Sequence, residues 1–378
     1  MKYVDELNRR FGQAVRDNVV RDIAQGRGIG PRGIGRTVVI LSAAIALTPY
    51  LVGALGIALV LFNLDSIPAI AIGALLVAAG YYLRAPRFRN RQETLRRAQA
   101  PSLFALLDEI SDRLEAPTID GIHVDGDFNA YMAEFGRQER VLGIGAPLWL
   151  AMTPPERLSV LAHEIAHLVN RDPARAKLTS GALETLWRWH DLSRPPELVD
   201  HETGTAFHYD DRGVIDQAFG AVFGGIVAAM ARAFETLIYA ESQRAEYLAD
   251  TASASVAGAD AVKRSLKKTI LAPLATQAVR DIYFDGSQKV EALRQIADAV
   301  RDADPNEAEK LYAEAVEELL TVDSSHPPTR YRMEVVGALG APHPALDAGQ
   351  VDWKSIDEEL APFLEEEEQK LLSRLIVQ

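Results

Sequence analysis

Two long apolar stretches near the start of the chain differ from the amphipathic pattern that follows them. Residues 37–62 and 67–83 contain no charged side chain. Because about 20 helical residues cross a hydrocarbon core of about 30 Å, each stretch predicts a transmembrane helix. The turn before Pro68 is short and polar, so residues 37–83 are expected to form a helical hairpin. A buried hairpin in a large soluble core is the alternative.

Arginines on both sides of this hairpin predict its orientation. The positive-inside rule keeps such arginines in the cytoplasm, and the turn between the two stretches contains one acid and no base. We therefore expect a two-span protein of the cell membrane, with both termini and the later segments in the cytoplasm. The flanking residues are Arg27, Arg32, Arg36, Arg84, Arg87, Arg89 and Arg91.

Residues 1–36 predict a mixed-charge helical segment in the cytoplasm and not a signal peptide. Val4, Leu7, Phe11 and Val15 recur at helical spacing, and no short apolar core lies near Met1. We expect this segment to pack on the rest of the protein, and a position along the membrane surface is the alternative.

An amphipathic helix is predicted to begin near Pro154. Thr153 and Glu156 fit a capping box, and proline favours the first helical position. The apolar residues that follow recur at helical spacing, so they predict a face that packs into a core. They are Leu158, Leu161, Ile165 and Leu168.

The other face of this helix carries the run HEIAH, with His163, Glu164 and His167. Helical residues four apart share a face, so both imidazoles can reach one Zn²⁺ while Glu164 lies beside the open coordination position. Asp172 follows closely enough to accept a hydrogen bond from an imidazole N–H. A pair of structural histidines is the alternative. The run predicts one zinc ion per chain and a hydrolase.

A third protein ligand is expected downstream, because zinc hydrolases usually hold the ion with three side chains. Glu246 and Asp250 share one face of a predicted helix, so Glu246 can bind the ion while Asp250 orients a histidine. Glu241 is the rival ligand, but its position on the helix turns it away from Glu246.

The rest of the pattern predicts a mainly helical α+β domain with a small sheet. Residues 102–114 have a helical pattern, and residues 121–124, 129–135 and 140–144 have an extended one. An edge strand beside the zinc helix can hold an extended substrate backbone, and an edge strand without a ligand is the alternative.

Three further segments have weaker patterns. Residues 190–213 predict a loop with solvated histidines (His190, His201 and His208), with a second metal site as the alternative. Residues 218–231 are apolar over about 14 residues, a length that favours a buried or membrane-apposed helix over a third span. Residues 341–378 predict an acidic tail that forms a solvated amphipathic helix.

Charge and cysteine content exclude several classes of function. The formal net charge is −13, and no basic stripe occurs outside the membrane flanks, so nucleic acid is not an expected partner. The chain has no cysteine, which excludes disulfides, thiolate ligands and a cysteine nucleophile. Nothing in the pattern predicts an oligomeric state.

Four separated motifs carry a family resemblance. They are Phe128-Asn129-Ala130 ahead of an edge strand, HEIAH, SQRAEYLAD at residues 242–250 and SHPPTRYRM at residues 325–333. In type and order they resemble motifs of the HtpX-like and CAAX-prenyl-protease-type membrane zinc metallopeptidases, which are gluzincins. The match spans roughly residues 100–335. Gln243 and Met333 depart from the usual Arg and Ile, and one apolar segment, where two are common, separates the zinc helix from the third ligand.

The resemblance implies a zincin-like metallopeptidase domain over residues 84–340, after the hairpin. It implies His163, His167 and Glu246 as zinc ligands and Glu164 as the general base. His326 and Arg332 would lie near the active site as candidate donors to an oxyanion. Asn129 and Ala130 would contact the substrate.

The predicted function is a membrane-anchored zinc metalloendopeptidase that cleaves unfolded or membrane proteins at the cytoplasmic face, with zinc-activated water as the nucleophile. The first alternative is a catalytically silent zinc-fold scaffold that binds partners. Glu164 disfavours that alternative, because a purely structural zinc site does not require this carboxylate. A zinc hydrolase of non-peptide bonds is the second alternative. The sequence contains no evident cue for prenylated substrates.

Overall fold

The three predicted strands form one mixed sheet. β1 (Gly121–Asp125) pairs in parallel with β3 (Glu139–Gly145), and β2 (Ala130–Phe135) pairs antiparallel with β3. The order β1-β3-β2 places β2 at an edge of the sheet. Asn129 directly precedes this edge strand, as its motif predicts.

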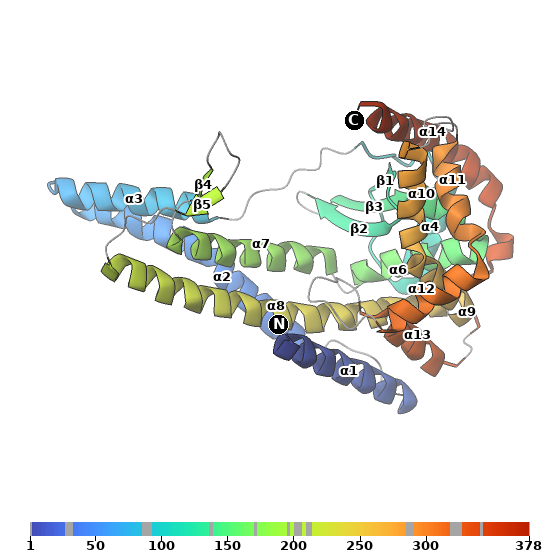
Figure 1. The fold of residues 1–378 in the computed structure, drawn as a ribbon, viewed down its shortest axis with the longest axis horizontal. Coiled ribbons are helices and arrows are strands. Elements are labelled where there is room, and N and C mark those ends of the chain that lie inside the picture. Colours follow the sequence, from blue (N-terminus) through green and yellow to red (C-terminus); the bar gives the residue numbers. More distant parts are fainter. Residues whose placement is uncertain are drawn as a thin grey trace. The chain divides into compact units, whose positions relative to one another are not determined.

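The computed structural model separates into two compact units (Figure 1). The first, here called the sheet unit, comprises Met1–Gly30, Phe88–Pro173 and Ser242–Gln378, and the second, the hairpin unit, comprises Pro31–Arg87 and Ala174–Glu241. Each unit is described by itself. The structure describes residues 2–26, 33–84, 93–135, 139–169, 172–194, 197–199, 206–208, 214–284, 291–317, 327–340 and 343–377.

The helix of the HEIAH run begins and ends close to the predicted residues. α6 spans Pro154–Val169, and the backbone N–H of Thr153 donates to Glu156 Oε2 at 2.8 Å, which is one half of the predicted capping box. The predicted apolar face is buried in the main core of the sheet unit, where α6 packs against β2, α4 (Pro101–Leu114) and α9 (Ala259–Ile270). The buried residues of this face are Leu158, Leu161, Ile165 and Leu168.

The two apolar stretches near the start of the chain form a helical hairpin in the hairpin unit. α2 spans Gly33–Phe62 and α3 spans Ile67–Leu83. Glycines let the two backbones approach closely: a Cβ atom on Gly80 would lie 2.5 Å from the carbonyl oxygen of Pro49. Large apolar side chains cover the outside of both helices, as expected for a surface that faces lipid. Among them are Ile40, Leu51, Leu61, Ile72, Leu75 and Tyr81.

A helix much longer than the 218–231 pattern indicates follows in the chain. α8 runs as one helix over Val214–Ala257 and contributes residues to both units. Two segments, Gly35–Phe62 and Gly220–Ala257, are long and apolar enough to cross a membrane by length and composition. The apolar part of α8 therefore qualifies as a candidate span. The sequence pattern, with about 14 apolar residues, favoured a buried or membrane-apposed helix over a third span.

The segment at 190–213, which we expected to be a loop, contains some regular structure. α7 (Asp172–Ser193) precedes a two-stranded antiparallel pair of β4 (Glu197–Val199) and β5 (Ala206–His208). His201 lies outside the described residues. His190 Nδ1 lies 3.1 Å from the carbonyl oxygen of Gly224, so this histidine is bonded within the hairpin unit.

Both terminal helices of the chain pack on the sheet unit. α1 (Lys2–Ala24) buries Val19 against Tyr247 and Val335, in agreement with a packed helix. α14 (Trp353–Val377) is amphipathic, but Ile356 and Leu360 belong to the main core. The acidic segment is therefore an integral part of the sheet unit and more than a solvated tail.

Five further helices and one short 3₁₀ helix complete the sheet unit. They are α5 (Ala146–Ala151), α10 (Ala272–Phe284), α11 (Ala292–Arg301), α12 (Pro305–Glu317), α13 (Thr329–Ala338) and η1 (Ala348–Gln350). Among them, α5 contacts β3 and η1 contacts α6, and α5, α10, α11 and α12 contribute to a second apolar core.

Candidate metal centre

Two imidazoles and one carboxylate converge between α6 and α8. His163 Nε2 lies 3.2 Å from His167 Nε2. Each of these nitrogens lies 3.5 Å from an oxygen of Glu246, His163 from Oε2 and His167 from Oε1. His163 and Glu246 are buried, and His167 is partly buried, so the three groups form an enclosed cluster.

The separations within this cluster match those around a tetrahedral ion. Ligand atoms at about 2.1 Å from a tetrahedral zinc ion lie about 3.4 Å apart. The observed separations of 3.2 and 3.5 Å are close to that value, and one donor atom from each residue lies within 4.8 Å of the others. His163, His167 and Glu246 therefore form a group that could hold a metal ion, with nitrogen and oxygen donors that suit zinc.

The second nitrogen of each imidazole contacts an aspartate. His163 Nδ1 lies 3.1 Å from Asp250 Oδ1, and His167 Nδ1 lies 3.0 Å from Asp172 Oδ2. A hydrogen bond from Nδ1–H to a carboxylate leaves the Nε2 lone pair directed into the cluster. Both aspartates occupy the positions that the spacing of the sequence predicts for orienting groups.

Arg332 from α13 contacts two of the carboxylates in this arrangement, those of Asp250 and Glu246. Its Nε and Nη2 atoms donate to the two oxygens of Asp250 at 2.8 and 2.7 Å. Its Nη1 atom lies 3.3 Å from Glu246 Oε2. A planar guanidinium suits such a bidentate pair, and one arginine thus contacts both carboxylates that α8 contributes.

The surrounding carboxylates favour positive charge at the centre. Burial lowers the pKa of His163, but the hydrogen bonds with Asp250 and Glu246 outweigh burial and raise the pKa to about 10. Burial also lowers the pKa of His167, and the bond with Asp172 reverses this effect and raises it. Burial raises the pKa of Asp250, whereas the guanidinium of Arg332 lowers it overall. A site that stabilises charge in this way suits a bound dication.

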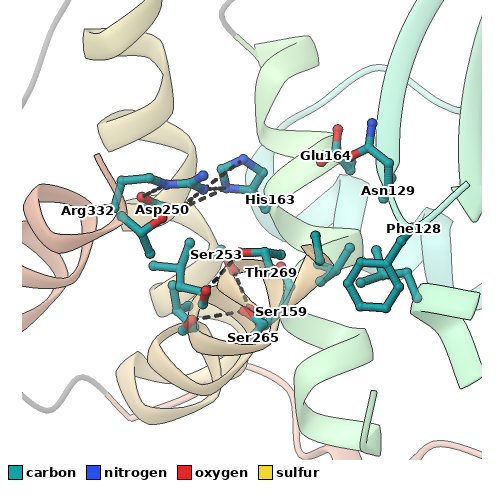
Figure 2. Close-up of a pocket in the computed structure, with 17 residues that line it drawn as sticks. Phe128, Asn129, Ser159, His163, Glu164, Asp250, Ser253, Ser265, Thr269 and Arg332 are labelled. Atoms are coloured by element: carbon teal, nitrogen blue, oxygen red, sulfur yellow. Dashed lines mark hydrogen bonds and ion pairs between the residues drawn. The ribbon is translucent and has the colours of Figure 1, made fainter. Parts of the chain in front are cut away.

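Glu164 borders a cavity of about 340 Å³ next to the cluster. The cavity is also lined by Asn129 and Ala130 at the start of the edge strand β2 and by His163 and Arg332 (Figure 2). Figure 2 shows Glu164 and Asn129 close together on one side, and His163, Asp250 and Arg332 on the other. The sheet edge, the carboxylate and one imidazole therefore meet around the same space.

The rival third ligand lies elsewhere. Glu241 belongs to the hairpin unit, where its Oε1 atom accepts a hydrogen bond from Arg175 Nη1 at 2.7 Å.

His326 lies outside the described residues. Gln243, which departs from the family pattern, is fully buried, and Met333 packs on a small core around Val262.

The sequence interpretation missed a group of hydroxyls below the histidines. Ser159, Ser253 and Ser265 come from α6, α8 and α9 and also line the cavity. Helical spacing contained a signal for two of them. Ser159 precedes His163 by one turn, and Ser253 follows Asp250 by about one turn, so each shares a face with a residue of the cluster.

Comparison with known proteins agrees with this geometry. The model of peptidase family M48 matches residues 97–339, which include the cluster, the sheet and α13. The chain belongs to peptidase family M48. No solved structure matches the chain significantly.

Several proteins that are similar to this chain carry the name HtpX. A "Protease HtpX homolog" of Pyrobaculum calidifontis is 29% identical over 250 residues, which cover 63% of this chain and 68% of the relative. The homolog of Syntrophobacter fumaroxidans is 26% identical over 251 residues, 63% of this chain and 82% of the relative. Together with the apolar helices, these matches identify the chain as a membrane metallopeptidase of the HtpX-like type.

Proposed function

We propose that the protein is a zinc metalloendopeptidase that is anchored in the cell membrane and hydrolyses peptide bonds at the cytoplasmic face. The single observation that carries this proposal is the triangle of His163 Nε2, His167 Nε2 and Glu246, with edges of 3.2 and 3.5 Å, beside Glu164 in the cavity. The donor set of two imidazoles and one carboxylate is that of catalytic zinc in known peptidases.

Different residues of the chain have different roles in the proposed hydrolysis. His163, His167 and Glu246 would hold one zinc ion per chain. Bound zinc lowers the pKa of a water molecule and polarises a carbonyl. Glu164 accepts the proton of the attacking water as the general base and passes it to the leaving amine as the general acid.

Asp250 and Asp172 keep the imidazoles in the tautomer and orientation that the ion needs. Arg332 fixes Asp250 and Glu246 and also borders the cavity, so its positive charge stabilises the oxyanion that forms when the carbonyl is attacked. We extend the same role to His326 on the family motif alone.

The sheet edge supports a polypeptide substrate. Along the part of the chain that the structure describes, β2 pairs with β3 and with no other strand. An extended substrate can add to the edge of β2, and Asn129 and Ala130 at its start lie against the same cavity as Glu164. Because compact proteins do not offer extended backbone, we propose unfolded or membrane proteins as the substrates.

The hairpin of α2 and α3 supports a bilayer as the second partner. Its outer surface is apolar along its length, and Arg36 and Arg84 flank its two ends on the side away from the turn. We propose that both ends, and the peptidase domain over residues 84–340 with them, face the cytoplasm. A further crossing by α8 would change this topology.

Cleavage of an unfolded reporter tests the proposed function. The zinc-loaded wild-type protein in detergent should cleave the reporter, and Glu164→Gln should bind zinc equally well while losing at least about 1,000-fold in rate. Glu115→Gln is a matched control, because Glu115 lies at the end of α4 and does not line the cavity. Cleavage that persists in Glu164→Gln would overturn the assignment of the base, and bound zinc without any Glu164-dependent cleavage would favour a scaffold.

A further inference from the structure

The cavity beside Glu164 continues beyond the groups that the proposed reaction uses. Its lining also includes aliphatic side chains from four helices and a group of hydroxyls. The titratable residues in this lining are His163, Asp250 and Arg332 of the metal centre and the proposed base Glu164. The aliphatic residues are Leu148, Val160, Val262, Leu266 and Ala272.

The hydroxyl hydrogens in this cavity are already engaged with protein acceptors. Ser253 Oγ donates to the carbonyl oxygen of Ser159 at 2.7 Å. Ser265 Oγ donates to the carbonyl oxygen of Val262 at 2.9 Å, so the 3.0 Å contact between Ser159 and Ser265 is a donation from Ser159. Each hydroxyl has a single hydrogen, and what these groups still offer to a ligand is oxygen lone pairs.

Thr269 repeats this pattern at a more exposed position. Its Oγ1 atom donates to the carbonyl oxygen of Leu266 at 2.8 Å, and its side chain lines the cavity. Figure 2 shows Thr269, Ser159, Ser253 and Ser265 grouped together below His163. This group of hydroxyls therefore accepts hydrogen bonds and carries no positive charge.

These features point to selection by charge. A carboxylate side chain in the cavity would face hydroxyl lone pairs and the carboxylates of Glu164 and Asp250. The guanidinium of Arg332 is already engaged with Asp250 and Glu246 and, in the proposed reaction, with the oxyanion. A lysine side chain would lose its hydration among the aliphatic walls, and pairing with Glu164 would occupy the carboxylate that the proposed reaction needs as its base. An uncharged side chain avoids both costs.

We propose that this cavity is a specificity subsite, which receives the side chain of one substrate residue flanking the scissile bond and selects an uncharged side chain. The inference rests on the proposed function and adds to it the class of residue at the cleavage site. Its basis is that one continuous cavity is bordered by Glu164, by the start of the edge strand at Asn129 and Ala130, and by the hydroxyl group at Ser159, Ser253, Ser265 and Thr269.

Peptides that differ at one position test this subsite. Two series vary the residue on each side of the scissile bond in turn, each with the isosteric pair Asn and Asp and the similarly long pair Met and Lys. At one of the two positions, kcat/KM of the zinc-loaded full-length protein should be at least about tenfold higher for Asn than for Asp and for Met than for Lys.

Charge placed in the cavity should change this preference. Thr269→Lys should reduce the Asn-to-Asp ratio by about tenfold, and Thr269→Asp should reduce the Met-to-Lys ratio by a similar factor. Thr276 provides the matched control, because it is an exposed threonine that donates to the carbonyl oxygen of Ala272 at 3.3 Å and does not line the cavity. Thr276→Lys and Thr276→Asp should leave both ratios unchanged.

The possible outcomes distinguish a failure of the proposed subsite from a failure of the proposed peptidase function. Shifts of opposite sign in the two Thr269 variants, with none in the Thr276 variants, support the subsite. Glu164-dependent cleavage that is indifferent to charge at both flanking positions overturns the subsite and leaves the peptidase assignment in place. Absence of Glu164-dependent cleavage for every peptide overturns the peptidase assignment, and the subsite with it.

Discussion

Arg332 donates two hydrogen bonds to the carboxylate of Asp250, at 2.7 and 2.8 Å, and the same carboxylate lies 3.1 Å from His163 Nδ1. A residue far along the chain, on α13, thereby sets the position of a candidate metal ligand on α6. Arg332 also contacts Glu246, so one side chain helps to position the candidate ligands on both α6 and α8.

Replacing Arg332 should weaken metal binding without removing a metal ligand. Arg332→Lys keeps the charge but loses the bidentate geometry, so the zinc affinity should fall by about 10- to 100-fold in competition with a chelator. Arg330→Lys is the control, because Arg330 is exposed and pairs with Glu334. Equal zinc affinity of Arg332→Lys and wild type would show that Asp250 and Glu246 need no such support.

The acidic helix α14 should contribute to stability through single carboxylates. Glu359 accepts hydrogen bonds from the backbone N–H groups of Ser102 and Leu103 at 2.8 and 3.0 Å, so it caps the first turn of α4 from another helix. Glu359→Gln should lower the free energy of unfolding by about 1 kcal/mol in chemical denaturation. The neighbouring Glu358→Gln, at an exposed position, should change it by less than about 0.5 kcal/mol. Equal effects of the two variants would refute the capping role.

Glu156 should make stability depend on acid pH. Burial raises the pKa of Glu156, but the ion pair with Lys268 at 2.8 Å and the bond from Thr153 outweigh burial and lower it. The pKa in the folded state is thus below the unfolded value of about 4.3, so the stabilisation is complete above that pH and is lost as the pH falls through the folded pKa.

Glu156→Gln should therefore cost about 2 to 4 kcal/mol at pH 7 and less at pH 3 than at pH 7, as measured by denaturation in detergent at both pH values. Glu109→Gln serves as the control, since Glu109 is exposed and pairs with Arg113 at 3.6 Å. A deficit for Glu156→Gln that is the same at both pH values would contradict the ion pair as its cause.

Close packing of α2 on α3 should depend on the absence of side chains at particular glycines. A Cβ atom on Gly80 would lie 2.5 Å from the carbonyl oxygen of Pro49, whereas one on Gly53 would meet nothing within 4 Å. Gly80→Ala should therefore destabilise the hairpin by about 1 to 3 kcal/mol and speed hydrogen exchange along α3, and Gly53→Ala should not. Matching exchange rates in the two variants would argue against the observed helix pairing.

Local pattern predicted the parts of the candidate site that lie on single elements. Spacing within one helix places His163 beside His167, and Glu246 beside Asp250, wherever that helix lies in the fold. The capping box fixed the start of α6, and alternation fixed the three strands to within about one or two residues, because both signals depend on neighbouring residues.

Contacts between distant elements could not be predicted in this way. The approach of Arg332 to Asp250, the meeting of Ser159, Ser253 and Ser265, and the burial of Ile356 in α14 all depend on how helices pack together. Charge density also misled the interpretation of the tail. Its glutamates suggested a solvated helix, whereas its apolar positions decide where the helix packs.

The ligand shell of the bound ion is the most direct test of the proposed site. X-ray absorption at the zinc edge of the purified protein should show two imidazoles and carboxylate oxygen at about 2.0 to 2.2 Å. Glu246→Gln should lose the ion or this oxygen contribution, while Glu241→Gln, which alters the acid paired with Arg175, should retain the wild-type spectrum. A full zinc content and an unchanged spectrum in Glu246→Gln would contradict the proposed centre.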